Sequence, residues 1–293
     1  MPDGKPAPLV LIYDFDGTLA PGEMQEHSFI PSLGLKSAEF WAQSNEMARD
    51  SNGDRILLYM HLMLREAIAH NIRRSRAAFR EHGRGMPFFP GVEAWFRRIN
   101  EEGKKRGLEI QHFVISSGLL EMIEGSAIFP EFTKVFASTY LYDANDVAVA
   151  PALAINYTTK TQFLFRINKG ALDLADDAAV NAYIDKQDRP VPFANMIYIG
   201  DGATDIPCFR LVREQGGTSI AVYDPRREGL DTRAAQLIDD HRVDFVAPAD
   251  YRAGHALSDF VLAAMDQVAA RTRMLHLARK GRQGKARPRP SFS

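Results

Sequence analysis

Short apolar runs that end in polar or turn-forming residues recur along the chain. They occupy residues 9–13, 110–115, 196–199 and 219–223. The first run is continuous and bounded by turn signals, which is typical of a strand buried on both faces of a parallel sheet, and the other three repeat this pattern with a few polar positions. The pattern therefore predicts four buried parallel strands.

Helical periodicity appears between these runs. In residues 91–105, apolar side chains recur at Val92, Trp95, Phe96 and Ile99, a spacing that places them on one face of a helix. Strands that alternate with helices predict an α/β fold with a parallel sheet. Ligands of such folds bind beyond the carboxyl ends of the strands, so we expect the functional groups there.

Residues 21–86 interrupt this alternation. Two helical stretches, residues 37–49 and 55–70, follow one another there with no strand signal between them. An apolar stripe along the second stretch predicts packing against other helices. We therefore expect residues 1–20 and 87–270 to form the main domain, with residues 21–86 inserted as a helical cap.

Composition indicates an ordinary soluble globular protein, because 45% of the residues are hydrophobic and 25% are charged. The formal net charge of −1 gives no overall attraction to nucleic acid or to an anionic membrane. Only residues 271–293, rich in Arg, Lys, Gly and Pro, depart from this balance, and they predict a basic, disordered tail. Aromatic residues suited to base stacking are missing from this tail until Phe292, so at most weak contacts with nucleic acid are expected.

Cysteine usage bears on the cellular location. Cys208 is the single cysteine, so the chain cannot form an intramolecular disulfide. A packed thiol is the expected role of this residue, since it lies beside Phe209 in a helical stretch. The early apolar run is too short to span a bilayer, and we expect a cytoplasmic protein without a membrane partner.

Two acidic clusters follow predicted strands. Asp14 and Asp16 come directly after the first run, and Asp201 and Asp205 follow the run at residues 196–199. At the same edge of a sheet, these carboxylates would repel one another unless a cation or protons compensate their charge. Magnesium suits such a site, because it binds one or two carboxylates, waters and phosphate oxygens.

These clusters belong to a set of four motifs. Together the motifs resemble those of the haloacid dehalogenase superfamily, in its phosphoserine-phosphatase-like kind with a helical cap. This resemblance implies a three-layer Rossmann-like α/β core. In chain order the matching positions are Asp14, Asp16 and Thr18; Ile115, Ser116 and Gly118; Lys169; and Gly200, Asp201, Gly202 and Asp205.

The resemblance implies a role for each acid. Asp14 would attack phosphorus and form an aspartyl phosphate. Asp16 would protonate the leaving oxygen and later accept a proton from water. The implied Mg²⁺ would be held by Asp14, the main-chain carbonyl of Asp16, Asp201 and Asp205, the last acting through water or through hydrogen bonds to the ligands.

The resemblance also implies the groups that hold the substrate phosphate. Ser116 and Lys169 would bind its oxygens, with Thr18, Ser117 and Gly118 completing the site. For the lysine and the serine that bind phosphate, the sequence leaves an alternative residue open. Lys160 lies near Lys169 in the sequence, but the polar context of Lys169 at an expected helix start favours the later residue, and Ser117 could replace Ser116.

A magnesium-dependent phosphatase that hydrolyses a small phosphomonoester through an aspartyl-phosphate intermediate is the predicted function. Asp16 favours this chemistry over dehalogenation, because a departing halide needs no proton. The cap would supply substrate contacts, with Glu23, Gln25, His27 and Arg49 as candidates. Phosphoserine is a reasonable first substrate to test.

Two alternatives remain open. A phosphotransferase or phosphomutase would use the same site with an acceptor other than water. A noncatalytic protein that binds a polyanion through its basic tail is the second alternative, and the acidic clusters count against it.

Overall fold

A seven-stranded sheet forms the centre of the computed structural model, which describes residues 6–283. The sheet has the strand order β4-β3-β2-β1-β5-β6-β7. Its strands are β1 (Ala7–Tyr13), β2 (Leu108–Leu119), β3 (Lys134–Tyr142), β4 (Ala148–Leu153), β5 (Met196–Gly200), β6 (Thr218–Tyr223) and β7 (Phe245–Pro248).

All neighbouring strands are parallel except β3 and β4, which are antiparallel. The four predicted strands correspond to β1, β2, β5 and β6, so the predicted α/β fold with a parallel sheet is confirmed. The chain leaves β1 on one side for β2 and later returns on its other side as β5. This reversal of strand order between β1 and β5 is where α/β sheets place their ligands.

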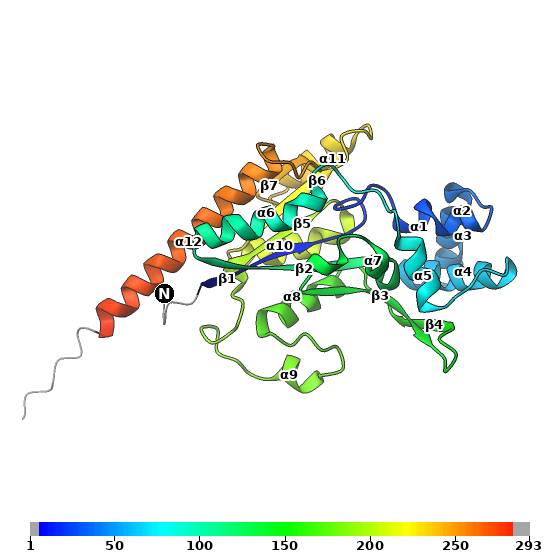
Figure 1. Cartoon of the computed structure of the whole chain (residues 1–293), viewed down its shortest axis with the longest axis horizontal. Helices are drawn as coiled ribbons and strands as arrows, with labels where there is room; N and C mark the ends of the chain where they lie inside the picture. The colour runs from blue at the N-terminus through cyan, green and yellow to red at the C-terminus, as the bar shows by residue number, and fades with distance from the viewer. Residues whose placement is uncertain (1–5, 284–293) are drawn as a thin grey trace, which may run out of the picture.

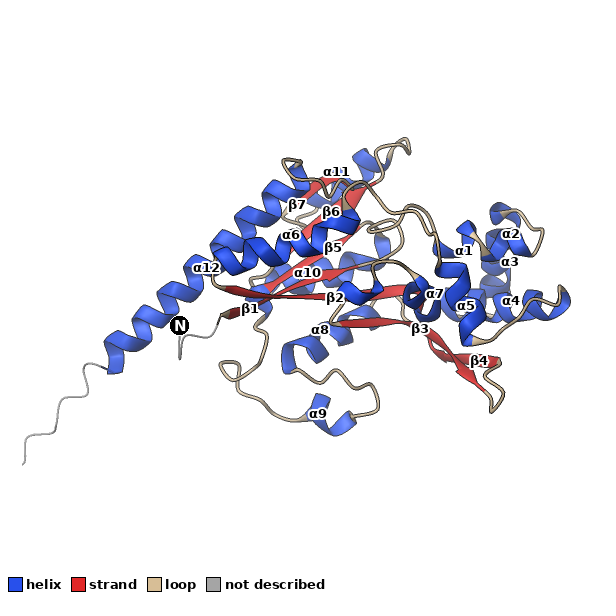
Figure 2. Ribbon diagram, in the orientation of Figure 1, coloured by secondary structure: helices blue, strands red, loops and turns tan. Residues whose placement is uncertain are grey.

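Helices cover both faces of the sheet and make a three-layer core (Figure 2). Alternate side chains of β1 point to opposite faces, so Leu11 lies in one hydrophobic cluster and Ile12 in another. On the first face pack α6 (Val92–Lys105) and α12 (Ala256–Gln283). On the second face pack α8 (Thr159–Lys169), α10 (Ile206–Glu214) and α11 (Leu230–Asp239).

Residues 21–86 contain helices and no strand, apart from an isolated β-bridge between Ser75 and Val147, and Figure 1 shows these helices gathered at one end of the sheet. The helices predicted at residues 37–49 and 55–70 are confirmed with the predicted first residues. The division into a separate cap domain stays a prediction, and we call residues 21–86 the cap segment. Its helices are α1 (Met24–His27), α2 (Phe29–Ser32), α3 (Ser37–Asp50), α4 (Arg55–Ala69) and α5 (Arg76–Gly83).

The hairpin of β3 and β4 was not expected from the sequence. It packs against the cap segment: Tyr140 donates a hydrogen bond from its hydroxyl to the main-chain oxygen of Met60 at 2.9 Å. The guanidinium of Arg76 lies 3.9 Å from the centre of the Tyr142 ring and pairs with Asp146 at 3.0 Å. The hairpin therefore attaches the cap segment to the edge of the sheet.

Short elements complete the fold. They are α7 (Leu120–Gly125), α9 (Asp177–Asn181) and the 3-10 helices η2 (Phe129–Glu131), η3 (Phe193–Asn195) and η4 (Ala203–Asp205). Cap helix α5 packs closely on α7, since a β-carbon on Gly83 would lie 1.9 Å from the main-chain oxygen of Met122. Among the described helices, none combines the length and the apolar character that a membrane crossing requires.

The boundary predicted for the tail is wrong. Helix α12 continues past residue 271 to Gln283 and projects from the body of the molecule (Figure 1). Arg271 donates hydrogen bonds to the main-chain oxygen of Ala194 and, at 2.9 Å, to the side-chain oxygen of Asn195. This residue therefore ties α12 to η3. The rest of the predicted tail, residues 284–293, lies outside the described part of the chain.

Cys208 is a packed thiol, as predicted. It is fully buried on α10, and burial raises the pKa of its thiol to about 12.

Candidate active site

Asp14 lies directly after β1, at the reversal of strand order. Its main-chain N–H donates to the oxygen of Ile199 on β5 at 2.9 Å, which fixes the backbone between the two strands. Its side-chain Oδ1 accepts a hydrogen bond from the N–H of Phe15 at 2.7 Å. The residue is only 5% exposed, yet it lines a cavity of about 260 Å³. A carboxylate is thus held rigidly at a point that a small ligand can reach.

Lys160 contacts this carboxylate. Its Nζ lies 2.7 Å from Oδ2 of Asp14 and 2.8 Å from Oδ1 of Asp205, and the side chain is fully buried. Burial opposes the charged amine, but the two carboxylates outweigh burial and raise the pKa of Lys160 above its ordinary value. A positive charge is therefore fixed behind Asp14.

Lys169 lies elsewhere, and its predicted place in the site is wrong. It is the last residue of α8, and its Nζ donates to the main-chain oxygens of Val180 and Ala182 at 2.7 and 2.8 Å. Helix α8 begins at Thr159, so Lys160 occupies the helix start that was assigned to Lys169. The lysine motif thus fits Lys160, and the segment after α8, which includes α9, accounts for the long spacing from either lysine to Asp201.

Asp205 is buried and held on both carboxylate oxygens. Besides Lys160, its Oδ1 accepts from the hydroxyl of Tyr198 at 2.8 Å. Its Oδ2 accepts from the N–H groups of Asp201 and Gly202, each at 3.2 Å. Asp205 therefore shapes the loop after β5 and positions both Asp201 and Lys160.

The carboxylates of Asp14, Asp201 and Asp205 can each offer an oxygen within 4.8 Å of the others. Burial is the largest cause that raises the pKa of Asp201 well above its ordinary value, and the charges of Asp205 and Asp14 add to it. Burial and Asp205 likewise raise the pKa of Asp14 to about 7, although Lys160 opposes them. Such a cluster suits a hard divalent cation, which would compensate the crowded negative charge. Since Asp205 is fully hydrogen-bonded, Asp14 and Asp201 are the better placed direct ligands.

Asp16 lines the same cavity. Its Oδ1 accepts a hydrogen bond from the N–H of Met24 at 2.9 Å. Burial, followed by the charge of Glu23 and that of Asp14, raises the pKa of Asp16 well above its ordinary value. A protonated carboxyl group near neutral pH is what a general acid requires. The side chain of Asp16 is not part of the three-carboxylate group; its predicted metal contact is the main-chain carbonyl.

The last part of β2, where its pairing with β3 is irregular, brings three more predicted residues to the cavity: Ser116, Ser117 and Gly118. The Oγ of Ser116 accepts from the N–H of Gly118 at 3.0 Å. A β-carbon on Gly118 would lie 2.8 Å from Oδ2 of Asp16, so glycine allows the acid to approach. Thr18, in contrast, is fully buried and does not line the cavity; its main-chain oxygen accepts a hydrogen bond from Tyr251 at 2.9 Å.

Gly17 links the two acidic loops. Its φ of +70° lies in the left-handed region, and a β-carbon there would lie 2.1 Å from Oδ2 of Asp201. Both the turn after Asp16 and the position of Asp201 therefore require glycine at this point.

A second cavity, of about 390 Å³, continues from the first toward the cap segment. Of the four cap candidates, Glu23 and Gln25 line it. His27 does not, and its Nε2 is 2.8 Å from the oxygen of Pro21. Arg49 is exposed and does not line the cavity either. Sequence reasoning missed Arg227, which reaches both cavities from the loop after β6. The residues common to the two cavities are Gly22, Glu23, Ile56, Ser117, Gly118 and Arg227.

A carboxylate, a buried lysine and a second acidic loop thus meet where the strand order reverses. A family model described as haloacid dehalogenase-like hydrolase matches residues 11–210, more than half of the chain. The chain belongs to this family, and the resemblance seen in the motifs is confirmed.

Comparison with individual proteins gives one relative in sequence and several in fold. An uncharacterized protein of Borreliella burgdorferi is 29% identical, over 87% of this chain and 95% of the relative. A HAD family hydrolase from Salmonella enterica serovar Typhi superposes with a TM-score of 0.52 at 19% identity, over 83% of this chain and 67% of that one. A probable phosphoserine phosphatase from Vibrio cholerae gives 0.51 at 11% identity, over 92% and 69%. These two likenesses show a shared fold.

Proposed function

We propose that this protein is a magnesium-dependent phosphatase that hydrolyses a small phosphomonoester through an aspartyl phosphate on Asp14. One observation carries the proposal: the carboxylate of Asp14 lines a cavity while Lys160 holds it from behind at 2.7 Å, with Asp16 and Asp201 lining the same cavity. A nucleophile, a fixed positive charge, an acid and a metal ligand thus surround one space.

In the first step an oxygen of Asp14 forms a bond to phosphorus as the bond from phosphorus to the leaving oxygen breaks. Asp16 transfers its proton to that leaving oxygen, so the product departs as a neutral alcohol. Its raised pKa supports this role, because the acid must still hold its proton near neutral pH. Lys160 offsets the negative charge of Asp14, which lowers the repulsion between this carboxylate and an anionic phosphate.

In the second step water attacks the phosphorus of the acyl phosphate. The carboxylate of Asp16 now accepts a proton from this water, and the bond between phosphorus and Asp14 breaks. Inorganic phosphate leaves, and both carboxyl groups return to their starting states. Ser116, Ser117 and Gly118 lie where they can orient the phosphate oxygens in both steps.

Asp14 and Asp201 would hold the metal ion together with the main-chain carbonyl of Asp16. When bound, Mg²⁺ supplies positive charge that stabilises the transferring phosphoryl group and favours the ionised form of Asp14. Asp205 acts through the hydrogen bonds that position Asp201 and Lys160.

Hydrolysis of p-nitrophenyl phosphate by the purified full-length protein tests the proposal. We expect activity with Mg²⁺, loss of activity in excess chelator, and recovery when Mg²⁺ is restored. Asp14→Asn should remove nearly all activity, since an amide is a poor nucleophile, and mass spectrometry of acid-quenched wild-type enzyme should detect phosphate on Asp14. Full activity after rigorous metal removal, or wild-type turnover by Asp14→Asn, would contradict the mechanism.

A further inference from the structure

The cavity on the cap side is lined by many polar side chains. Seven of them make no side-chain hydrogen bond or ion pair with any other described residue: Glu23, Gln25, Ser44, Asn45, Arg55, Ser117 and Arg227. Two are deeply buried, with Gln25 1% exposed and Ser44 3% exposed. The amide oxygen of Gln25 and the hydroxyl of Ser117 are themselves cut off from solvent without a partner. Glu23, Arg55 and Arg227 are exposed and Asn45 is half-buried, so these side chains can exchange water for the polar groups of a ligand in the cavity.

These side chains are chemically mixed. The carboxylate of Glu23 can only accept hydrogen bonds, and the guanidinium groups of Arg55 and Arg227 can only donate them. Ser44 and Asn45 can do both. A hydroxyl group also donates and accepts, so a chain of hydroxyls can satisfy every member of this wall without carrying charge.

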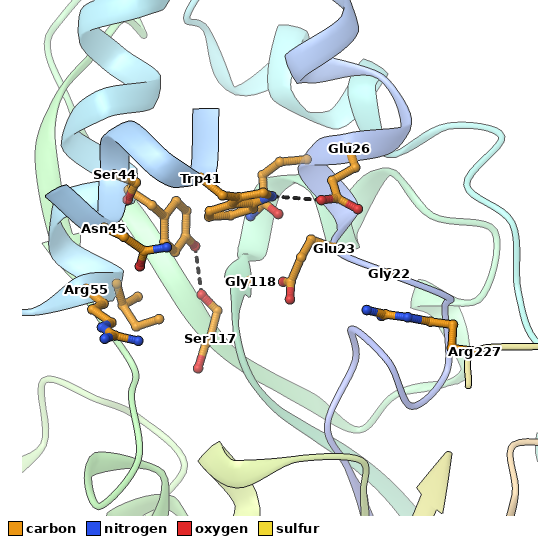
Figure 3. A pocket seen from close by; sticks show the side chains of 13 residues that line it. Gly22, Glu23, Glu26, Trp41, Ser44, Asn45, Arg55, Ser117, Gly118 and Arg227 are labelled. Atoms are coloured by element: carbon orange, nitrogen blue, oxygen red, sulfur yellow. Dashed lines mark hydrogen bonds between the residues drawn. The ribbon is translucent and has the colours of Figure 1, made fainter. Parts of the chain in front are cut away.

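The two arginines lie on opposite sides of the cavity, Arg55 from α4 and Arg227 from the loop after β6, with Glu23 between them (Figure 3). An amino-acid head group carries one ammonium and one carboxylate on the same carbon. It could reach one arginine and Glu23, but it would leave the opposite arginine and Asn45 unpaired. A longer ligand with polar groups along its length fits the distribution better.

Trp41 gives the cavity a rigid apolar surface. Its Nε1–H donates to Oε1 of Glu26 at 2.8 Å, and its ring packs edge-to-face against Phe40 and Tyr59 at 5.2 and 5.8 Å between ring centres. Figure 3 shows the indole between Glu26 and the polar pair Ser44 and Asn45. An indole held in one orientation can pack against the C–H groups of a polyol or sugar while polar neighbours bind its hydroxyls.

From this wall we infer that the leaving group of the substrate is polyhydroxylated, a sugar or polyol that carries the phosphate on one end. The phosphate occupies the cavity at Asp14, and the hydroxylated part extends past Ser117 and Glu23 to Asn45 and Arg55. This inference rests on the proposed phosphatase function for the reaction, but the binding preference can be measured without turnover.

The test uses the full-length Asp14→Asn variant with Mg²⁺ and three phosphomonoesters: D-glucitol 6-phosphate, n-hexyl phosphate and phosphoserine. Titration calorimetry should give binding of glucitol 6-phosphate at least about 100-fold tighter than hexyl phosphate, because hexyl phosphate leaves the polar wall unpaired. Glucitol 6-phosphate should also bind more tightly than phosphoserine. Equal affinities for the two six-carbon esters, tightest binding of phosphoserine, or no binding of glucitol 6-phosphate would overturn the inference.

A matched pair of variants in the Asp14→Asn background locates the preference. Asn45→Leu should lower the ratio of the two six-carbon affinities about tenfold, since it removes both a donor and an acceptor from the wall. Gln43→Leu removes an amide from the same helix outside the cavity and should leave the ratio unchanged. If Asn45→Leu leaves the ratio unchanged, the polar wall does not select the leaving group.

The outcomes for the two proposals are separable. Absence of p-nitrophenyl phosphate hydrolysis by the wild-type protein would reject the phosphatase function, whatever the calorimetry shows. Hydrolysis of that ester without a preference for glucitol 6-phosphate over hexyl phosphate would reject only the polyhydroxylated leaving group.

Discussion

The choice between the two candidate lysines shows how the role of a residue depends on its position along a helix. Lys160 and Lys169 lie at opposite ends of α8, roughly 13 Å apart along its axis at the usual rise per residue. The sequence predicts that the chemistry needs a lysine, but the choice depends on where α8 begins. The turn before α8 is closed by the hydroxyl of Thr159, which accepts from the N–H of Asn156 at 2.7 Å and donates to the main-chain oxygen of Asn156 at 2.8 Å.

Replacement of each lysine by methionine tests this assignment. We expect Lys160→Met to lower kcat/KM for p-nitrophenyl phosphate at least about 100-fold, because Asp14 loses its fixed positive partner. Lys169→Met should stay within about threefold of wild type, since it loses only contacts to Val180 and Ala182 far from the cavity. Melting temperatures of both variants serve as the control for folding. A larger activity loss for Lys169→Met would restore the original prediction.

A second residue-scale prediction concerns Asp16. If its carboxyl group protonates the leaving oxygen, Asp16→Asn should lower turnover of an alkyl phosphate about 100-fold or more. The loss for p-nitrophenyl phosphate should be much smaller, since p-nitrophenolate departs without a proton. Comparison of kcat for the two esters in both proteins measures the difference. Equal losses would show that Asp16 acts through structure or metal binding instead.

At the scale of elements, the sequence predicts the strands that can be recognised from their own residues. Asp14, Ser116 and Asp201 each follow an apolar run in the sequence, so their convergence at one cavity could be expected from the rule for parallel sheets. Strand β3 gives no such run, because it contains Ser138 and Thr139. Their hydroxyls donate to the oxygen of Ser117 and to Glu121, at 3.1 and 2.6 Å, and neither partner is visible in the local sequence.

The join between β1, β2 and α6 contains a hydrogen-bond chain with a fixed direction. The indole of Trp95 can only donate, so Tyr13 accepts from it at 2.8 Å and donates its own proton to Nδ1 of His112 at 3.0 Å. His112 must then carry its proton on Nε2, which lies 3.1 Å from the oxygen of Asn100. The neutral imidazole is the form that fits, and burial lowers the pKa of His112 to about 3.

This depressed pKa predicts acid sensitivity. The unfolded chain binds a proton at His112 below its ordinary pKa of 6.5, but the folded chain does so only near 3. The stability that His112 contributes is therefore complete above 6.5 and is lost as pH falls toward 3, by at most about 1.4 kcal/mol per pH unit. Urea unfolding of wild type and His112→Gln between pH 7 and 4 should show a shallower pH dependence for the variant. If the free energy of unfolding changed with pH equally in both proteins, the lowered pKa of His112 would be contradicted.

At the scale of the molecule, the cap segment and the sheet share one hydrophobic core. Met60 and Phe79 from the cap segment belong to the same buried cluster as Leu11 of β1 and Trp95 of α6. The hairpin of β3 and β4 and the packing of α5 on α7 add polar and close contacts at the edges. We therefore expect the two parts to unfold together.

The two tryptophans allow this expectation to be measured, because Trp41 lies in the cap segment and Trp95 lies in the main core. Trp41→Phe and Trp95→Phe each leave one fluorophore. Within each variant, the thermal transition of the remaining tryptophan should coincide with loss of helical circular dichroism, the mark of a two-state transition. A lower midpoint for Trp41 fluorescence than for circular dichroism in Trp95→Phe would show that the cap segment unfolds on its own.

The buried thiol of Cys208 has a practical consequence for following motion at the cavity mouth. A thiol with a pKa of about 12, enclosed in α10, is almost entirely protonated near neutral pH and inaccessible to maleimides. Cys208 of the native chain should therefore not react during site-directed labelling. Cysteines introduced at exposed positions such as Arg49 on α3 and Glu228 in the loop beside Arg227 would be the reactive ones. A donor and an acceptor dye attached there would report by energy transfer whether the cap segment moves when phosphate binds.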